Sequence, residues 1–148
     1  MDNYGNRTIT SANAVVTIRA QGLYDAPVRL EGFATDAIVN PAQVNSVVAE
    51  MGADGHLSFG YTPQPQPVTF SFQADSPSRQ IMEDLCSDQR ALGEVVIVQV
   101  EAVLPGIGRK YTGTRGAVTA EQPGSPAAQT LQSSQYTITF ESWVGSDL

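Results

Sequence analysis

The sequence predicts a mainly β fold, in which two packed β-sheets form a sandwich or partial barrel with one flanking α-helix and long loops. Apolar and polar residues alternate with a period of two over much of the 148-residue chain, which is typical of half-buried strands. Glycine- and proline-rich turns separate these segments. One stretch, at 77–91, has a helical period instead. The length fits a single domain, residues 1–148, that can bury a sizeable core.

The first third of the chain contains two predicted strands, at 14–19 and 28–33, after a polar N-terminal arm at 1–12. Both strands are rich in β-branched residues, which fit a pleated surface. Residues 21–22 and 25–27 are predicted turns between the two strands. The next segment, 34–46, alternates poorly and contains an Asn-Pro pair. We therefore expect a long loop there, which can include short extended pieces.

A β-hairpin is predicted next. Strands at 47–51 and 56–61 flank the turn Gly52-Ala53-Asp54-Gly55. The two glycines can adopt the positive φ angles that such a loop demands, and aspartate favours turns.

The predicted helix, at about 77–91, has both capping signals. Ser76 is a good N-cap residue, and Pro77 suits the first helical position, where a missing N–H costs nothing. Gly93 fits the C-terminal cap. The apolar stripe is short, so we expect the helix to lie on a sheet; its members are Ile81, Met82, Leu85 and Cys86.

Four further segments read as strands. The segment 68–73 alternates cleanly, which suits a sheet with one face in a core. The segment 94–104 is apolar on both faces at its start, as in a strand that is covered on both sides. Strands are also predicted within 109–121 and at 135–143, with a Pro- and Gly-rich loop between them.

Residues able to carry out catalysis or bind metal are scarce. The chain has one histidine, His56, and one cysteine, Cys86, whereas a Cys/His nucleophile pair also needs an orienting group and a pocket. One His and one Cys leave only scattered carboxylates for a metal. The run 106–110 resembles a phosphate-binding loop, but strand-like sequence follows it where a helix is needed. We therefore expect no catalytic residue, no metal site and no cofactor, with Cys86 packed as a small apolar residue.

The chain is acidic, with 15 acidic and 8 basic residues and a net charge of −7. Without a dense basic patch it should not bind a phosphate backbone tightly. The acidity either serves solubility or gives a surface that DNA passes without sticking. No apolar run approaches the roughly 20 residues of a transmembrane helix, and the polar start lacks the apolar stretch of a secretory signal. We expect synthesis in a cytoplasm and no membrane insertion.

Three of the eight basic residues fall within seven positions: Arg109, Lys110 and Arg115. Two interpretations stay open for this cluster. It is an exposed hairpin end, or it contacts an acidic surface on a neighbouring copy of the chain.

The middle of the chain resembles the small tail tube proteins of tailed bacteriophages. The matching features are the turn within 50–55 and the strand after it, the strand 68–72, and Ser76-Pro77 at the start of the helix. The closing Phe140-Glu141-Ser142-Trp143 adds to the match, which covers roughly residues 13–143. None of these motifs is a catalytic signature.

The resemblance implies a virion structural protein of the tail, not an enzyme. Members of the family form six-membered rings that stack into a tube, and strands from all subunits line a lumen through which DNA passes. It also implies contacts with sheath, baseplate and tail terminator proteins, and synthesis in the host bacterial cytoplasm. The long loop at 34–46 is the first candidate for contacts between rings, and the segment 104–116 is the second. The inter-subunit candidates are Thr35, Asp36, Ile38, Val39, Asn40, Pro41, Arg109, Lys110 and Arg115. The acidic candidates for the lumen are Glu31, Glu50, Asp54 and Glu141.

Other readings remain open. The chain could instead be the inner tube of a contractile injection particle, another tail component such as a terminator or baseplate hub protein, or a generic ligand-binding β-sandwich. These classes differ in assembly. A tube protein gives long tubes, a terminator gives single rings, and a ligand-binding domain gives monomers or small oligomers.

Overall fold

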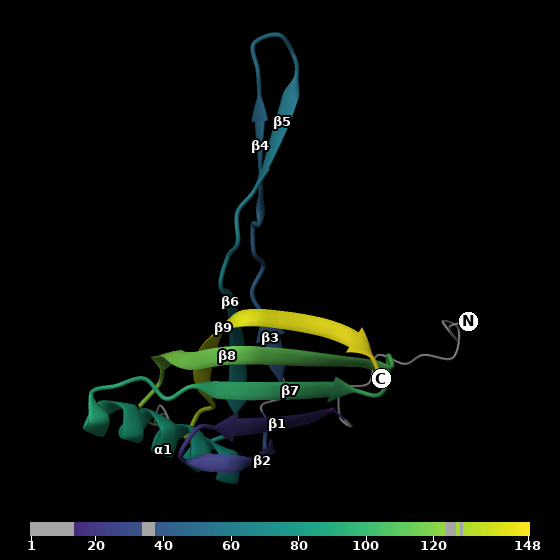
Figure 1. Ribbon diagram of the computed structural model, residues 1–148. Helices are drawn as coiled ribbons and strands as arrows, with labels where there is room; N and C mark the ends of the chain where they lie inside the picture. Colours follow the sequence, from purple (N-terminus) through teal and green to yellow (C-terminus); the bar gives the residue numbers. More distant parts are fainter. Residues whose placement is uncertain (1–13, 34–37, 124–126, 128) are drawn as a thin grey trace.

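The computed structural model describes residues 14–33, 38–123, 127 and 129–148, and in this part it is mainly β with one α-helix (Figure 1). The helix is α1 (Pro77–Leu92). The strands are β1 (Val15–Ala20), β2 (Tyr24–Leu30), β3 (Val39–Pro41), β4 (Val47–Met51), β5 (Leu57–Tyr61), β6 (Gln66–Phe72), β7 (Val98–Leu104), β8 (Arg109–Glu121) and β9 (Ser134–Asp147). The predicted fold class is confirmed as mainly β, with two sheets and one helix.

The strands form two sheets of unequal size. Seven strands make an antiparallel sheet in the order β2-β1-β7-β8-β9-β6-β3, and β4 pairs with β5 in a separate two-stranded sheet. The seven-stranded sheet is open, with β2 and β3 at its edges. The small sheet projects far from the body (Figure 1). The core therefore forms against one face of the large sheet.

The large sheet bends along its longest strands. The first half of β9 pairs with β6, and most of its length pairs with β8 (Figure 1). At the bend, Arg115 has a φ of 49°, and the register between β7 and β8 shifts beside it. The Phe140 ring lies against Gly113, where an added Cβ would come within 2.7 Å of it. A residue without a side chain is needed there for the ring to fit.

The core lies between this bent sheet and α1. Alternate residues of β1, β6, β7 and β9 are fully buried, and α1 adds Met82, Leu85 and Cys86. The side chains that alternate with the buried ones lie on the opposite surface of the sheet. The main buried residues from the strands are Val16, Ile18, Val68, Phe70, Phe72, Val98, Val100, Tyr136, Ile138 and Phe140.

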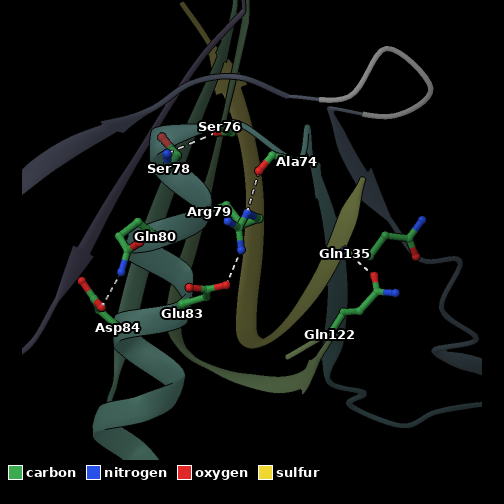
Figure 2. A network of polar contacts seen from close by, with 9 residues as sticks. All are labelled: Ala74, Ser76, Ser78, Arg79, Gln80, Glu83, Asp84, Gln122 and Gln135. Carbon is green, nitrogen blue, oxygen red and sulfur yellow. Dashed lines mark hydrogen bonds and ion pairs between the residues drawn. The ribbon is translucent and has the colours of Figure 1, made fainter. Parts of the chain in front are cut away.

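Helix α1 begins and ends as predicted. The Ser78 N–H donates to the Ser76 hydroxyl at 3.2 Å, and Gly93 caps the end with φ 65°. Figure 2 shows the polar contacts along its first turns, including the Arg79–Glu83 ion pair and a hydrogen bond from Arg79 Nε to the Ala74 carbonyl oxygen. Within the described part of the chain, no helix has the length and apolar character that crossing a membrane requires.

The start of α1 is also tied to the sheet edge. The Ser76 hydroxyl donates to the Glu31 carbonyl oxygen, and the Glu31 N–H donates to the Ser78 hydroxyl at 2.7 Å. Gly32, with φ 73°, brings the chain against Ser76. These contacts join the helix to the residue that follows β2.

Some predicted boundaries are wrong for identifiable reasons. Residues 25–27, predicted as a turn, lie inside β2. An edge strand accepts Pro27 because one side of its backbone has no ladder partner. The strand predicted from 94 begins only at Val98, since 94–97 leads from the helix cap into the sheet.

Candidate assembly surfaces

The arm, residues 42–65, carries the most exposed apolar surface in the described part of the chain (Figure 1). The register of its hairpin pairs Val47 with Tyr61, Ala49 with Phe59 and Met51 with Leu57. Paired residues and residues two apart share a face of a β-ribbon, so one face of the hairpin is wholly apolar. We call these six residues the apolar face of the arm.

The apolar face of the arm is open to solvent. Phe59 is 68% exposed, Tyr61 73% and Met51 63%. Contiguous exposed apolar patches mark interaction sites in soluble proteins. An isolated two-stranded ribbon is marginally stable in water, so a partner surface would also order this one.

The tip of the hairpin is built as predicted. The Gly52 N–H donates to the His56 carbonyl oxygen at 2.8 Å, and the His56 N–H donates to Asp54 Oδ1 at 3.1 Å. Gly55 has a φ of 87°. Asp54, a candidate for the lumen, therefore helps to form the turn. Glu50 is paired with Ser58 on the face opposite the apolar one, and its carboxylate has no hydrogen bond or ion pair to any described residue.

The outer face of the large sheet, turned away from the core, is rich in hydroxyl groups. Its members at alternate positions are Thr17, Thr69, Gln99, Glu101, Thr137 and Thr139. The hydroxyls of Thr69 and Thr137 lie 3.1 Å apart, and those of Thr119 and Thr139 lie 2.8 Å apart. The register also places Arg19, Arg29 and Lys110 on this face, beside Glu101. The face is therefore polar, with charges of both signs.

The four acidic lumen candidates do not form one cluster. Glu50 and Asp54 are together on the hairpin, Glu31 follows β2 beside the start of α1, and Glu141 is exposed on β9. Their positions are therefore distributed over three regions of the molecule.

The loop predicted at 34–46 contains a strand. Thr35 and Asp36 lie outside the described residues. Val39, Asn40 and Pro41 form β3, which pairs with β6, and Ile38 packs against the core. This segment forms an edge of the large sheet and leads into the arm.

The structure separates the basic cluster. Arg109 makes an ion pair with Asp147, Nη1 to Oδ1 2.8 Å, and lies over the Tyr111 ring. Lys110 is half-buried opposite Val103.

The third residue of the basic cluster, Arg115, lies at the bend and lines a pocket with Arg19 of β1. The sequence did not indicate that Arg19 and Arg115 line the same pocket, because the two arginines are far apart in the chain.

Cys86 packs as predicted, as a small buried residue of α1. Burial raises the pKa of its thiol to about 12, and the nearby Glu121 carboxylate contributes. Burial likewise raises the pKa of Tyr136 to about 12. The Tyr136 hydroxyl is buried and has no hydrogen-bond partner in the described structure. Because its pKa is raised, the Cys86 thiol is protonated at neutral pH, which makes it a poor nucleophile.

Comparison with solved structures shows a shared fold at low sequence identity. A chain of the PVC sheath–tube complex, an extracellular contractile injection system in its extended state, matches with TM-score 0.67 and 11% identity, covering 95% of this chain and 93% of that one. A chain of the anti-feeding prophage tube-terminating cap matches with TM-score 0.63 and 12% identity, covering 95% and 92%. A chain of the PVC sheath/tube terminator matches with TM-score 0.61 and 10% identity, covering 94% and 96%.

The fold is thus of the tail tube type, as the resemblance implied. No protein with curated annotation matches the sequence. A family model does, over residues 7–144, which is most of the chain. The chain belongs to the family described as tail fiber protein gp32, a family of tail proteins.

Proposed function

We propose that the protein is a tail tube subunit, which assembles as six-membered rings stacked into a tube through which DNA leaves the virion. The apolar face of the arm is the observation that carries this proposal. Six apolar side chains project from the body on a thin ribbon that no described part of the chain covers. A second copy is the partner that an isolated structural subunit always has available.

The open sheet supports closure into a ring. The edges at β2 and β3 leave backbone groups without ladder partners, and such edges are paired or protected in native assemblies. Joining different patches by rotation gives a closed ring, whereas contacts along the tube axis do not close and so propagate. In this arrangement the arm makes the contact between one ring and the next along the tube axis. Residues 38–41 then support the base of the arm and supply β3, in place of reaching between rings themselves.

The outer face of the large sheet is our candidate for the lumen wall. Its threonine hydroxyls separate the cations Arg19, Arg29 and Lys110 from one another, and carboxylates such as Glu101 lie among them, so DNA meets no dense cationic surface. Of the acidic lumen candidates, Glu31 and Glu141 lie on the body and would add to a surface that repels phosphate, whereas Glu50 and Asp54 lie on the arm, which makes the contact between rings. Further partners in the virion would be sheath, baseplate and terminator proteins, and synthesis would take place in the host bacterial cytoplasm.

The test is the assembly state of the purified chain, measured by negative-stain microscopy and sedimentation velocity. A tube subunit gives tubes about 10 nm wide, from six domains of this size around a ring. Single rings without tubes would assign the chain to the terminator class, whose fold it also shares. Monomers at high concentration would overturn the proposal.

A further inference from the structure

A pocket with two arginines lies at the end of β1, beside the turn to β2. It has a volume of about 310 Å³, and its polar lining includes Arg19, Arg115, Tyr24, Gln99 and Asp25, whose carboxylate accepts a hydrogen bond from the Gly22 N–H at 3.2 Å. The Arg19 Nε–H donates to the Asp25 carbonyl oxygen at 3.0 Å, which holds the side chain while its terminal nitrogens remain without a partner among the described residues. We call this the Arg19/Arg115 pocket.

The backbone places Arg115 in this pocket at a cost. Its φ of 49° is unusual for a residue with a side chain, and it occurs where β8 bulges against β7. The ladder sets Glu141 across from Arg115, since Thr114 pairs with Ser142 and Gly116 with Phe140. The described structure shows no ion pair between Arg115 and Glu141. The guanidinium group therefore lies at the pocket with its charge unpaired.

The surroundings of the pocket include exposed apolar groups. The Gln21 N–H donates to the Ile97 carbonyl oxygen at 3.0 Å, which fixes the β1–β2 turn to the linker after α1. That linker exposes Val95, 54% accessible, and Leu92 at the end of α1 is 69% accessible. A complementary partner would therefore combine a carboxylate with an apolar side chain.

The hairpin presents this combination on its second face. Glu50 and Val48 lie two residues apart, so they share the face opposite the apolar one, and Val48 is 58% exposed. Glu50 has no described partner, whereas Asp54 is held in the turn. Opposite them Gly60 has open space above it, so a partner surface can approach closely.

The arm and the pocket lie at opposite ends of the molecule. In Figure 1 the hairpin points away from the body on one side, and β1, β2 and α1 lie on the other. The Arg19/Arg115 pocket therefore cannot receive its own hairpin. A copy displaced along the arm direction brings its hairpin to this end, which is a heterologous contact that repeats.

We propose that the Arg19/Arg115 pocket receives the Glu50 carboxylate of a second copy, with Val48 of that hairpin against Val95. The inference rests on the proposed self-assembly and names the surface that accepts the arm. Two guanidinium groups can hold one carboxylate by charge-assisted hydrogen bonds. The same pairing neutralises two cations that would otherwise retain the phosphates of passing DNA.

The experiment is a charge swap on the full chain. Arg115→Glu and Glu50→Arg each place like charges together and should raise the concentration needed for tubes by about tenfold or more. The double variant restores an opposite pair and should recover to within about threefold of the wild type. Arg90→Glu, an exposed change of equal charge on α1 outside the pocket that removes only an exposed ion pair with Glu121, is the matched control and should assemble like the wild type. Far-UV circular dichroism and melting confirm that each variant is folded.

Results that contradict the pocket assignment can be told apart from results that contradict the proposed function. Single variants that assemble like the wild type, a double variant that does not recover, or an Arg90→Glu variant that is equally impaired would each overturn the pocket assignment. So would loss of labelled oligonucleotide binding in Arg115→Glu with assembly unchanged, because the pocket would then bind nucleic acid. Wild-type tubes with insensitive variants refute this inference and leave the proposed function standing. A wild type that stays monomeric refutes both.

Discussion

Phe59 lies directly across the hairpin ladder from Ala49, and its ring is 68% exposed on the apolar face of the arm. Because the neighbouring Ala49 side chain is small, the Phe59 ring protrudes from the surface of the ribbon. In folded monomers such a ring usually has a cover, and aromatic anchors of this kind dominate the energetics of protein interfaces.

We expect Phe59→Asp to abolish assembly and leave the fold intact. The ring makes no contribution to the core, so the free energy of unfolding should change by no more than about 0.5 kcal/mol. Burying a carboxylate in an apolar interface should raise the concentration needed for assembly by at least about tenfold. Sedimentation velocity and chemical denaturation measure the two effects.

Ser87→Asp is the matched control for this change. It adds the same charge at an exposed position of α1, away from the arm. Equal loss of assembly in both variants would show that the added charge, and not the apolar face, is what matters.

Gly32→Ala should destabilise the monomer by about 2–3 kcal/mol. The residue has φ 73°, and an added Cβ would lie 2.7 Å from the Ser76 Cβ. Ser76→Ala should cost about 1 kcal/mol by removing the cap and the contact to Glu31. Urea unfolding measures both, and Gly22→Ala, with φ 83° and no atom near its Cβ, isolates the cost of φ alone. A Gly32 effect no larger than that of Gly22 would argue against the close packing.

Tyr136→Phe should be neutral or stabilising, by up to about 1 kcal/mol. The hydroxyl is buried without a partner in the described structure, and removing an unsatisfied polar group relieves its desolvation. Thermal unfolding at pH 7 measures the difference. A loss of more than about 1 kcal/mol would instead indicate that the hydroxyl makes a hydrogen bond in solution.

Stability should fall as the pH rises above about 9. The Cys86 thiol has a folded pKa of about 12 against an ordinary 9.0, and Tyr136 about 12 against 10.0. Between these values the unfolded chain loses protons that the folded chain keeps, so alkali favours unfolding. We expect the free energy of unfolding, measured with urea from pH 8 to 11, to decline less steeply for the double variant Cys86→Ala/Tyr136→Phe than for the wild type. Equal declines would contradict the raised pKa values.

Local signals account for the elements that were predicted well. The caps Ser76 and Gly93 and the turn at Gly52–Gly55 act through neighbouring backbone groups, so their residues alone specify them. Arg19 and Arg115 line one pocket only because of the order of the strands in the sheet. Neighbouring residues in the sequence do not specify that order. Similarly, the alternation at 47–61 predicts a ribbon with one apolar face, but not that this face lies outside the core. The register of the hairpin could have revealed the apolar face from the sequence.

The root of the arm has a consequence for the timing of growth. The arm continues the β3–β6 ladder, since Ala42 N–H donates to the Pro67 carbonyl oxygen at 2.9 Å and Gln66 Nε2–H to the Ala42 carbonyl oxygen at 2.8 Å. Its direction is therefore fixed by the same strand whose free edge would receive a neighbour in the ring. In the assembly that we propose, a lone subunit holds its arm on a three-residue strand, and a lateral neighbour on β3 stiffens that support. Each completed ring would then present six aligned arms to the next, so elongation would proceed from finished rings and seldom from single subunits.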